Sequence, residues 1–121
     1  MSGISGPGIG GASDEGDPGD EARRRRVWRL ELFLDHLAVE RGLSDRTLAA
    51  YRGDVVRLIA FARGAGIGGP DEVEPAHLRD FTFSLKDAGL AASSIRRARS
   101  AVRTYFAFLL DEGVIEVDPT E

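Results

Sequence analysis

The chain has 121 residues and a formal net charge of −4, and 42% of its residues are hydrophobic, which is enough for one core without cross-links. It contains no cysteine, which excludes disulfides, thiolate zinc sites and thiol catalysis. No apolar run approaches the roughly 18 residues that span a bilayer, and the N-terminus lacks the basic start of a signal peptide. We therefore expect a cytoplasmic protein with no membrane partner.

The acidity belongs largely to the first residues of the chain. Residues 1–21 hold five of the 20 acids and none of the 16 bases, so the remainder carries 15 acids against 16 bases. This leader is rich in Gly, Pro and Ser and has almost no large apolar residue, so burial cannot offset the entropy cost of ordering it. We expect a disordered leader at 1–21 and a helical domain at 22–117. The leader is either a solvated extension without a role or a mask for basic side chains elsewhere.

The first predicted helix covers about residues 22–41 and carries two apolar stripes. Gly42 follows it as a natural C-terminal stop. One stripe has the spacing of a core-facing helix surface and contains Val27, Leu30, Phe33, Leu34 and Leu37. The other contains Trp28, Leu32 and Val39, so either this helix is buried on two sides or it offers a docking surface. The arginines at 23–26 either form a solvent-exposed start of this helix or neutralise nearby acids.

Two further helices follow, separated by a glycine-rich loop at residues 64–70. Ser44 is placed to cap the second helix, which extends to about Arg63. Its apolar stripe contains Leu48, Tyr51, Val55, Leu58, Ile59 and Ala62. Pro75 opens the third helix, which extends to about Asp87 with Leu78, Phe81, Phe83 and Leu85 as its apolar residues.

The fourth helix, at about residues 93–113, is the strongest indication of function. Ser93 or Ser94 is expected to cap it. Residues 90–110 hold four arginines and no acid, although the whole chain is acidic. At about 100° per residue, one face gathers Ile95, Ala98, Val102, Tyr105, Phe106 and Leu109. The opposite face gathers Arg96, Ser100, Arg103 and Thr104, flanked by Arg97 and Arg99. Arginine and hydroxyl side chains are the types that bind a DNA backbone. No strand pattern is present, so we predict an all-α fold, a compact bundle of four main helices with room for a short extra turn.

Several short motifs, in this order and spacing, resemble the N-terminal core-binding (SAM-like) domain of tyrosine recombinases and phage integrases, most nearly the Xer type. They are ERGLS, then Thr47, Leu48 and Tyr51 in register, then Asp54, then SSIRRARSAVR, then FLLDEG and VDPTE. The resemblance covers about residues 30–121. It implies that the second and fourth helices face the major groove of DNA. It also implies a catalytic domain after Pro119, with residues 118–121 starting the linker to it.

No residue of this chain is expected to catalyse a reaction. The arginines, lysine, histidines and nucleophilic tyrosine implied by the resemblance belong to the catalytic domain and cannot be assigned here. Tyr51 and Tyr105 lie on apolar stripes, where core tyrosines are the simpler interpretation. His36 and His77 have no partner at metal-ligand spacing, so neither a metal nor another cofactor is expected.

The predicted DNA-binding residues lie on the second and fourth helices and are basic or hydroxyl-bearing: Ser44, Arg46, Thr47, Arg52, Arg57, Ser93, Ser94, Arg96, Arg97, Ser100 and Arg103. Arg63 and Arg79 are expected to lie outside this surface. The expected partners are duplex DNA, the catalytic domain of the same protein and other recombinase protomers assembled on DNA. Ser44 is foremost a helix cap, and Arg52 has the alternative of pairing with a carboxylate. The competing function is a SAM-like protein-interaction module without DNA affinity. A helix-turn-helix repressor fits less well, because the connection at Leu43 lacks a short helix before a recognition helix.

Overall fold

The computed structural model describes residues 27–121; the predicted leader and the arginines at 23–26 lie outside the described residues. Within that range the chain forms four α-helices and one short 3₁₀ turn, with no strand. The elements are α3 (Leu30–Glu40), α4 (Asp45–Gly64), η1 (Pro70–Glu72), α5 (Pro75–Asp87) and α6 (Ala92–Asp111). The predicted all-α bundle of four main helices is therefore confirmed, and η1 is its short extra turn.

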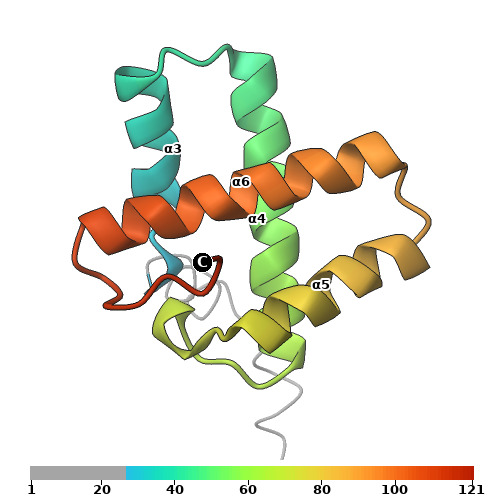
Figure 1. Ribbon diagram of the computed structural model, residues 1–121. Coiled ribbons are helices and arrows are strands. Elements are labelled where there is room, and N and C mark those ends of the chain that lie inside the picture. Colours follow the sequence, from blue (N-terminus) through green and yellow to red (C-terminus); the bar gives the residue numbers. More distant parts are fainter. Residues whose placement is uncertain (1–26) are drawn as a thin grey trace, which may run out of the picture.

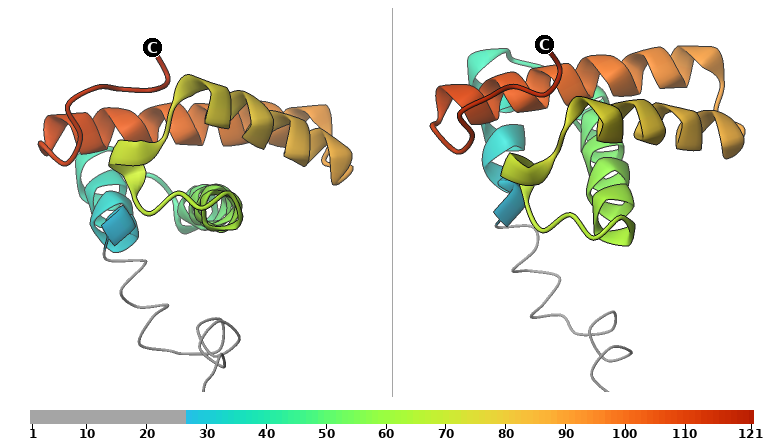
Figure 2. Two further views of the ribbon diagram at one scale, coloured as in Figure 1. Left: turned by 90° about the horizontal axis from the view of Figure 1, so that it is seen from below. Right: turned by 60° about the horizontal axis from the view of Figure 1, so that its bottom comes forward.

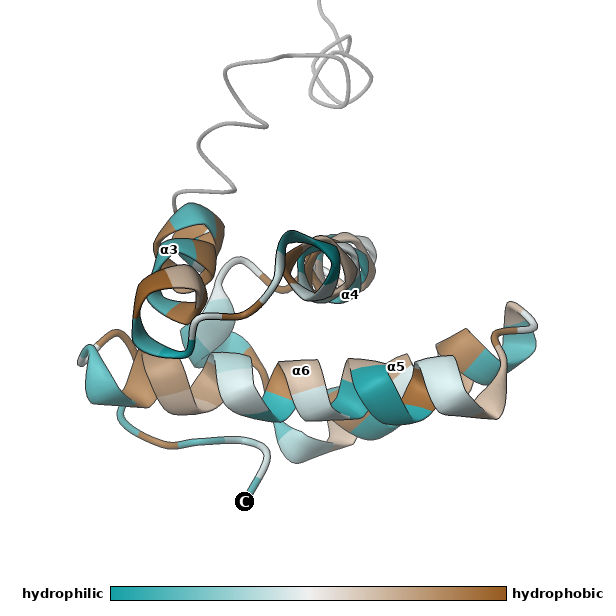
Figure 3. Ribbon diagram, turned by 90° about the horizontal axis from the view of Figure 1, so that it is seen from above, coloured by the Kyte–Doolittle hydropathy of each residue, from teal (hydrophilic) through white to brown (hydrophobic). Residues whose placement is uncertain are grey.

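The helices form two layers, which the views along the layers separate clearly (Figure 2, Figure 3). One layer holds α3 and α4, and the other holds α5 and α6. Helix α6 crosses α4 instead of running alongside it (Figure 1), and these two helices form the most extensive contact between elements. No helix in the described part of the chain is both long enough and apolar enough to cross a membrane.

Local signals explain most helix ends. Ser44 caps α4 as predicted, since its Oγ accepts a hydrogen bond from the Thr47 backbone N–H at 3.2 Å. Gly42, just after α3, has a φ of 59°, a conformation that glycine adopts without steric cost. The expected cap of α6 by Ser93 or Ser94 is wrong, because α6 begins at Ala92 and its N-cap, Ala91, offers no side-chain hydrogen bond.

The predicted core of α6 is confirmed at all six positions, from Ile95 to Leu109, and Ala101 and Phe108 are buried as well. Among the apolar residues of α5, Phe83 is 59% exposed, and the ammonium of Lys86 lies 5.4 Å from its ring centroid. One core assignment is wrong. Val27 is 45% exposed, because the helical phase changes just after it.

That phase change occurs at Arg29, where the first predicted helix is interrupted. Val27 and Trp28 are helical, but Arg29 has a φ of 58° in the left-handed region, and α3 proper starts only at Leu30. Such a conformation costs a non-glycine residue of the order of 1 kcal/mol. It turns Trp28 into the core, where the indole is 1% exposed, whereas Leu32 and Val39 stay exposed. The second apolar stripe is thus neither a second buried face nor a continuous docking surface.

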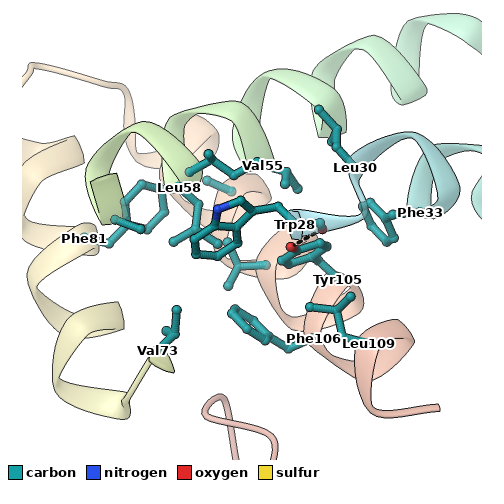
Figure 4. Packing of buried hydrophobic residues seen from close by; sticks show 14 of the residues in the cluster. Trp28, Leu30, Phe33, Val55, Leu58, Val73, Phe81, Tyr105, Phe106 and Leu109 are labelled. Carbon is teal, nitrogen blue, oxygen red and sulfur yellow. Dashed lines mark hydrogen bonds between the residues drawn. The ribbon is translucent and has the colours of Figure 1, made fainter. Parts of the chain in front are cut away.

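Trp28 is held by side chains from both layers (Figure 4). Its indole lies between Val55 and Leu58 of α4 and the aromatic residues Tyr105 and Phe106 of α6. The Tyr105 hydroxyl donates a hydrogen bond to the Trp28 carbonyl oxygen at 2.5 Å, which satisfies both buried polar groups. Phe33 adds an edge-on contact to the Tyr105 ring, with centroids 5.3 Å apart.

Leu109 tests the core of α6, because its direct neighbour is a natural control. Leu109 is 0% exposed, whereas Leu110 is 37% exposed. We expect Leu109→Ala to lower the free energy of unfolding by about 2–5 kcal/mol, since it leaves a cavity among packed side chains. Leu110→Ala should cost less than about 1 kcal/mol. Urea denaturation that shows equal losses for the two variants would contradict the assignment of the buried face.

Tyr105 should make stability depend on alkaline pH. Burial raises the pKa of its hydroxyl, with the charge of Arg29 acting weakly in the opposite direction. The folded state therefore holds this proton more tightly than the unfolded state, so the stabilisation is complete below the unfolded pKa of about 10 and is lost as the pH rises above it. Urea denaturation between pH 8 and 11 should show a fall in stability that Tyr105→Phe reduces. The same pH profile in both proteins would refute this role.

Candidate nucleic-acid interface

The junction of α4 and α6 is organised around a buried carboxylate. Asp54 of α4 is 0% exposed, and Arg97 of α6 donates from Nε to Oδ2 at 2.9 Å and from Nη2 to Oδ1 at 2.8 Å. Nη1 of Arg57 lies 3.5 Å from Oδ1 of the same carboxylate. A buried carboxylate is very unfavourable unless it is paired and hydrogen-bonded, and the two-pronged guanidinium contact provides both.

This junction keeps an excess of positive charge facing solvent. One carboxylate is shared by two guanidinium groups, whose side chains remain 38% exposed at Arg97 and 49% exposed at Arg57. The hydrogen bond to Asp54 raises the pKa of Arg97, and partial burial opposes it. Arg97 and Arg57, both predicted to bind DNA, therefore lie close together beside the same carboxylate.

A second group of arginines forms the exposed crest of α6. Arg96, Arg99 and Arg103 follow one another at spacings of three and four residues, which places them on one face, and all three are exposed. Within residues 27–121 none of the three forms an ion pair. Ser100 and Thr104 lie beside this crest and are half-buried. The sequence prediction treated Arg99 only as a flanking residue, although its spacing from Arg96 and Arg103 already placed it on this face.

The first turn of α4 offers a smaller polar surface. The Ser44 hydroxyl also donates to the Thr47 Oγ1 at 3.1 Å, so the two predicted hydroxyls bond to each other. Arg46 is exposed and Thr47 is half-buried. Within the described chain Arg46 has no ion pair, so its guanidinium can meet an external anion.

The remaining predicted residues lie in less distinctive places. Arg52 pairs with Glu31 of α3 at 3.2 Å, which was the alternative considered for it. Such an exposed pair contributes between zero and about 1 kcal/mol. Ser93 is exposed and Ser94 is half-buried in the first turn of α6.

The position of Arg79 in the structure differs from the one expected from the sequence. Together with Arg99 and Arg103 it lines a hollow between α5 and α6. It therefore adjoins the arginine crest and cannot serve as a residue outside the basic surface. The helical pattern of α5 alone could not reveal this, because only the packing of α5 beside α6 brings Arg79 near Arg103.

The tyrosines and histidines have structural partners. Tyr105 is buried and Tyr51 is half-buried. The His36 ring lies 5.0 Å from that of Phe108, and Nδ1 of His77 accepts a hydrogen bond from the Glu74 backbone N–H at the start of α5. Among residues 27–121 no group of three or more acids and histidines could hold a metal ion.

The sequence that forms α3 to α6 matches a known family. Residues 30–113 match the family model of the phage integrase N-terminal SAM-like domain. This chain belongs to that family. The resemblance read from the sequence motifs is thereby confirmed.

Curated relatives of this SAM-like domain are Xer tyrosine recombinases. The chain is 40% identical to tyrosine recombinase XerD of Chlorobaculum tepidum over 81% of its own length, which is 33% of the relative. It is 37% identical to XerC of Roseiflexus castenholzii, over 77% of the chain and 30% of the relative. For XerC of Xanthomonas campestris pv. campestris the identity is 39%, over 84% of the chain and 31% of the relative. The chain thus spans about a third of the length of these relatives. No solved structure matches it significantly.

A comparison of alanine variants at Arg97 and at its neighbour Arg96 tests the Asp54 anchor separately from the crest. Arg97→Ala leaves the buried Asp54 carboxylate without its two strongest hydrogen bonds, so we expect the free energy of unfolding to fall by about 1–3 kcal/mol. Arg96→Ala removes an exposed side chain and should stay within about 0.5 kcal/mol of the parent. Equal stabilities of the two variants in urea denaturation would show that the Asp54 pair does not anchor α6.

Proposed function

We propose that this domain is the DNA-binding half of a site-specific tyrosine recombinase and that it holds duplex DNA through α4 and α6. The observation that carries the proposal is the exposed crest of Arg96, Arg99 and Arg103, which has no ion pair within the described residues. A row of unneutralised arginines on a packed, rigid helix is suited to an external polyanion.

The dimensions of the crest suit a DNA backbone. With a rise of 1.5 Å per residue, Arg96 and Arg103 lie about 10 Å apart along α6. Each strand of duplex DNA carries about one negative charge per 3.4 Å of the axis, so this length corresponds to roughly three phosphates of one strand. Neutralising some of them releases condensed counterions, which gives affinity for any duplex sequence.

The Asp54 junction adds a preorganised contact beside the crest. A guanidinium has five N–H donors, and Arg97 uses two of them on Asp54, so three remain for a phosphate. Because Asp54 already fixes the Arg97 side chain, less conformational entropy is lost when DNA binds. Arg57 and Arg46, with the Ser44 and Thr47 hydroxyls, would extend this contact along α4.

The names of the relatives support the wider part of the proposal. They are tyrosine recombinases about three times as long as the matched region, and residues 30–113 match only the N-terminal SAM-like domain. We infer that DNA cutting and rejoining belong to a catalytic domain of the same protein, and that recombinase protomers assemble on the DNA. The buried Tyr105 and half-buried Tyr51 are unsuited to act as the nucleophile.

The salt dependence of DNA binding tests the crest directly. In Arg96→Ala/Arg103→Ala, affinity for any duplex should fall by a similar factor, and the slope of log affinity against log salt should decrease by about 2, at roughly 0.9 per lost phosphate contact. Stability should hardly change, because both side chains are exposed. Fluorescence anisotropy with labelled duplexes over a salt series measures the slope.

The matched control is Arg63→Ala/Lys86→Ala, which removes the same charge near the ends of α4 and α5. Its slope should stay close to that of the parent chain. If both double variants lose the same slope, the crest acts only as general positive charge. A parent chain that binds no duplex would favour the SAM-like protein-interaction module instead.

A further inference from the structure

A hollow of about 260 Å³ lies between α5 and α6, on the side where the chain passes after α6. Leu78 and Phe81 of α5 and Val102 of α6 contribute its apolar lining, and residues 119–121 line it from the C-terminal segment. Phe81 and Val102 are nearly buried, at 3% and 5% exposed. The hollow is therefore a feature of the packed bundle and not a gap at a loose end.

Three arginines from two helices surround this hollow. Arg79 comes from α5, and Arg99 and Arg103 come from α6. All three are exposed, and within the described chain none of them forms an ion pair. Glu121 is the one acid among the lining residues, and it makes no ion pair with a described base.

This arrangement favours a bound anion. Three like charges around one hollow repel one another, and the apolar lining strengthens electrostatic interactions by lowering the local polarisability. An anion placed among the three groups converts that repulsion into attraction. Guanidinium groups are planar forks that match the oxygens of a phosphate, which has more acceptor oxygens than a carboxylate to share among three arginines.

We propose that this hollow binds one phosphate of the DNA backbone, so that the DNA contact extends from α4 and α6 onto α5. The inference rests on the proposed DNA-binding function. A DNA phosphate is favoured over an acidic protein segment because Arg99 and Arg103 belong both to the hollow and to the α6 crest. DNA lying on the crest thus brings its backbone directly to the hollow. Arg79 would then be a DNA-binding residue that its position in the sequence does not reveal.

The test combines a protein variant with a chemically altered duplex. Arg79→Ala/Arg99→Ala, made in the 121-residue chain, should weaken binding to every duplex and reduce the salt slope by about 1, because one phosphate contact is lost. Arg63→Ala/Lys86→Ala loses the same charge and is the matched control. Circular dichroism confirms that each variant is folded before anisotropy is measured.

A series of duplexes with increasing numbers of uncharged methylphosphonates tests whether the contact is made to phosphate. Each neutral group should weaken binding of the parent chain more than binding of Arg79→Ala/Arg99→Ala, because the variant has one phosphate contact fewer to lose. A slope equal to that of the control variant would overturn the proposal, and so would a duplex series that affects parent and variant alike; an acidic protein segment would then be the better occupant. If the parent chain binds no duplex at all, the proposed function fails and this inference fails with it. Arg79→Ala alone separates the hollow from the crest, because Arg79 is the one arginine of the hollow that does not belong to the crest. If Arg96→Ala/Arg103→Ala lowers the slope and Arg79→Ala leaves it unchanged, only this inference fails.

Discussion

The paired charges of Asp54 and Arg97 connect the two layers at their largest contact. The carboxylate and the guanidinium come from residues 43 apart in the sequence and meet through two hydrogen bonds of 2.9 and 2.8 Å. Because Asp54 is fully buried, α6 can pack on α4 only where an arginine reaches that carboxylate. The pair therefore favours one register of the crossing helices among the several that apolar packing alone would allow. The same register determines which face of α6 points outward.

A second tie fixes the start of the bundle to its end. The Tyr105 hydroxyl bonds the Trp28 carbonyl, which precedes the break at Arg29. The break is a local cost, and the burial of a whole indole between α4 and α6 offsets it. Polar anchors thus stand at two sides of one apolar core. Each fixes a helix position that hydrophobic contacts would leave adjustable.

Much of the fold was predictable from sequence because the apolar spacing of α4 and α6 is regular. The cap at Ser44, the proline at the start of α5 and all six core positions of α6 follow from local rules. Val27 was assigned wrongly, because a helical wheel assumes one continuous phase and cannot show that Arg29 interrupts the helix. The exposure of Phe83, in contrast, follows from spacing alone, since it lies about 200° from Phe81 on the wheel of α5.

The candidate site was predictable only in part, because its two most informative features depend on contacts between helices. The helical pattern grouped Arg97 with the phosphate-facing arginines, but nothing within α6 shows that Arg97 binds Asp54 of α4. Arg79 likewise acquires its meaning only from the hollow that α5 and α6 form together. Which of these side chains contact DNA remains a prediction.

The segment after α6 folds back over the bundle instead of leaving it. Ile115 is 4% exposed and Asp118 is 8% exposed, and the Asp118 carboxylate accepts hydrogen bonds from the backbone and hydroxyl of Thr120. These residues are therefore expected to move together with the helical bundle. A force applied to the chain at Thr120 would be transmitted directly to α5 and α6. Any rotation of polypeptide attached there would rotate the arginine crest with it.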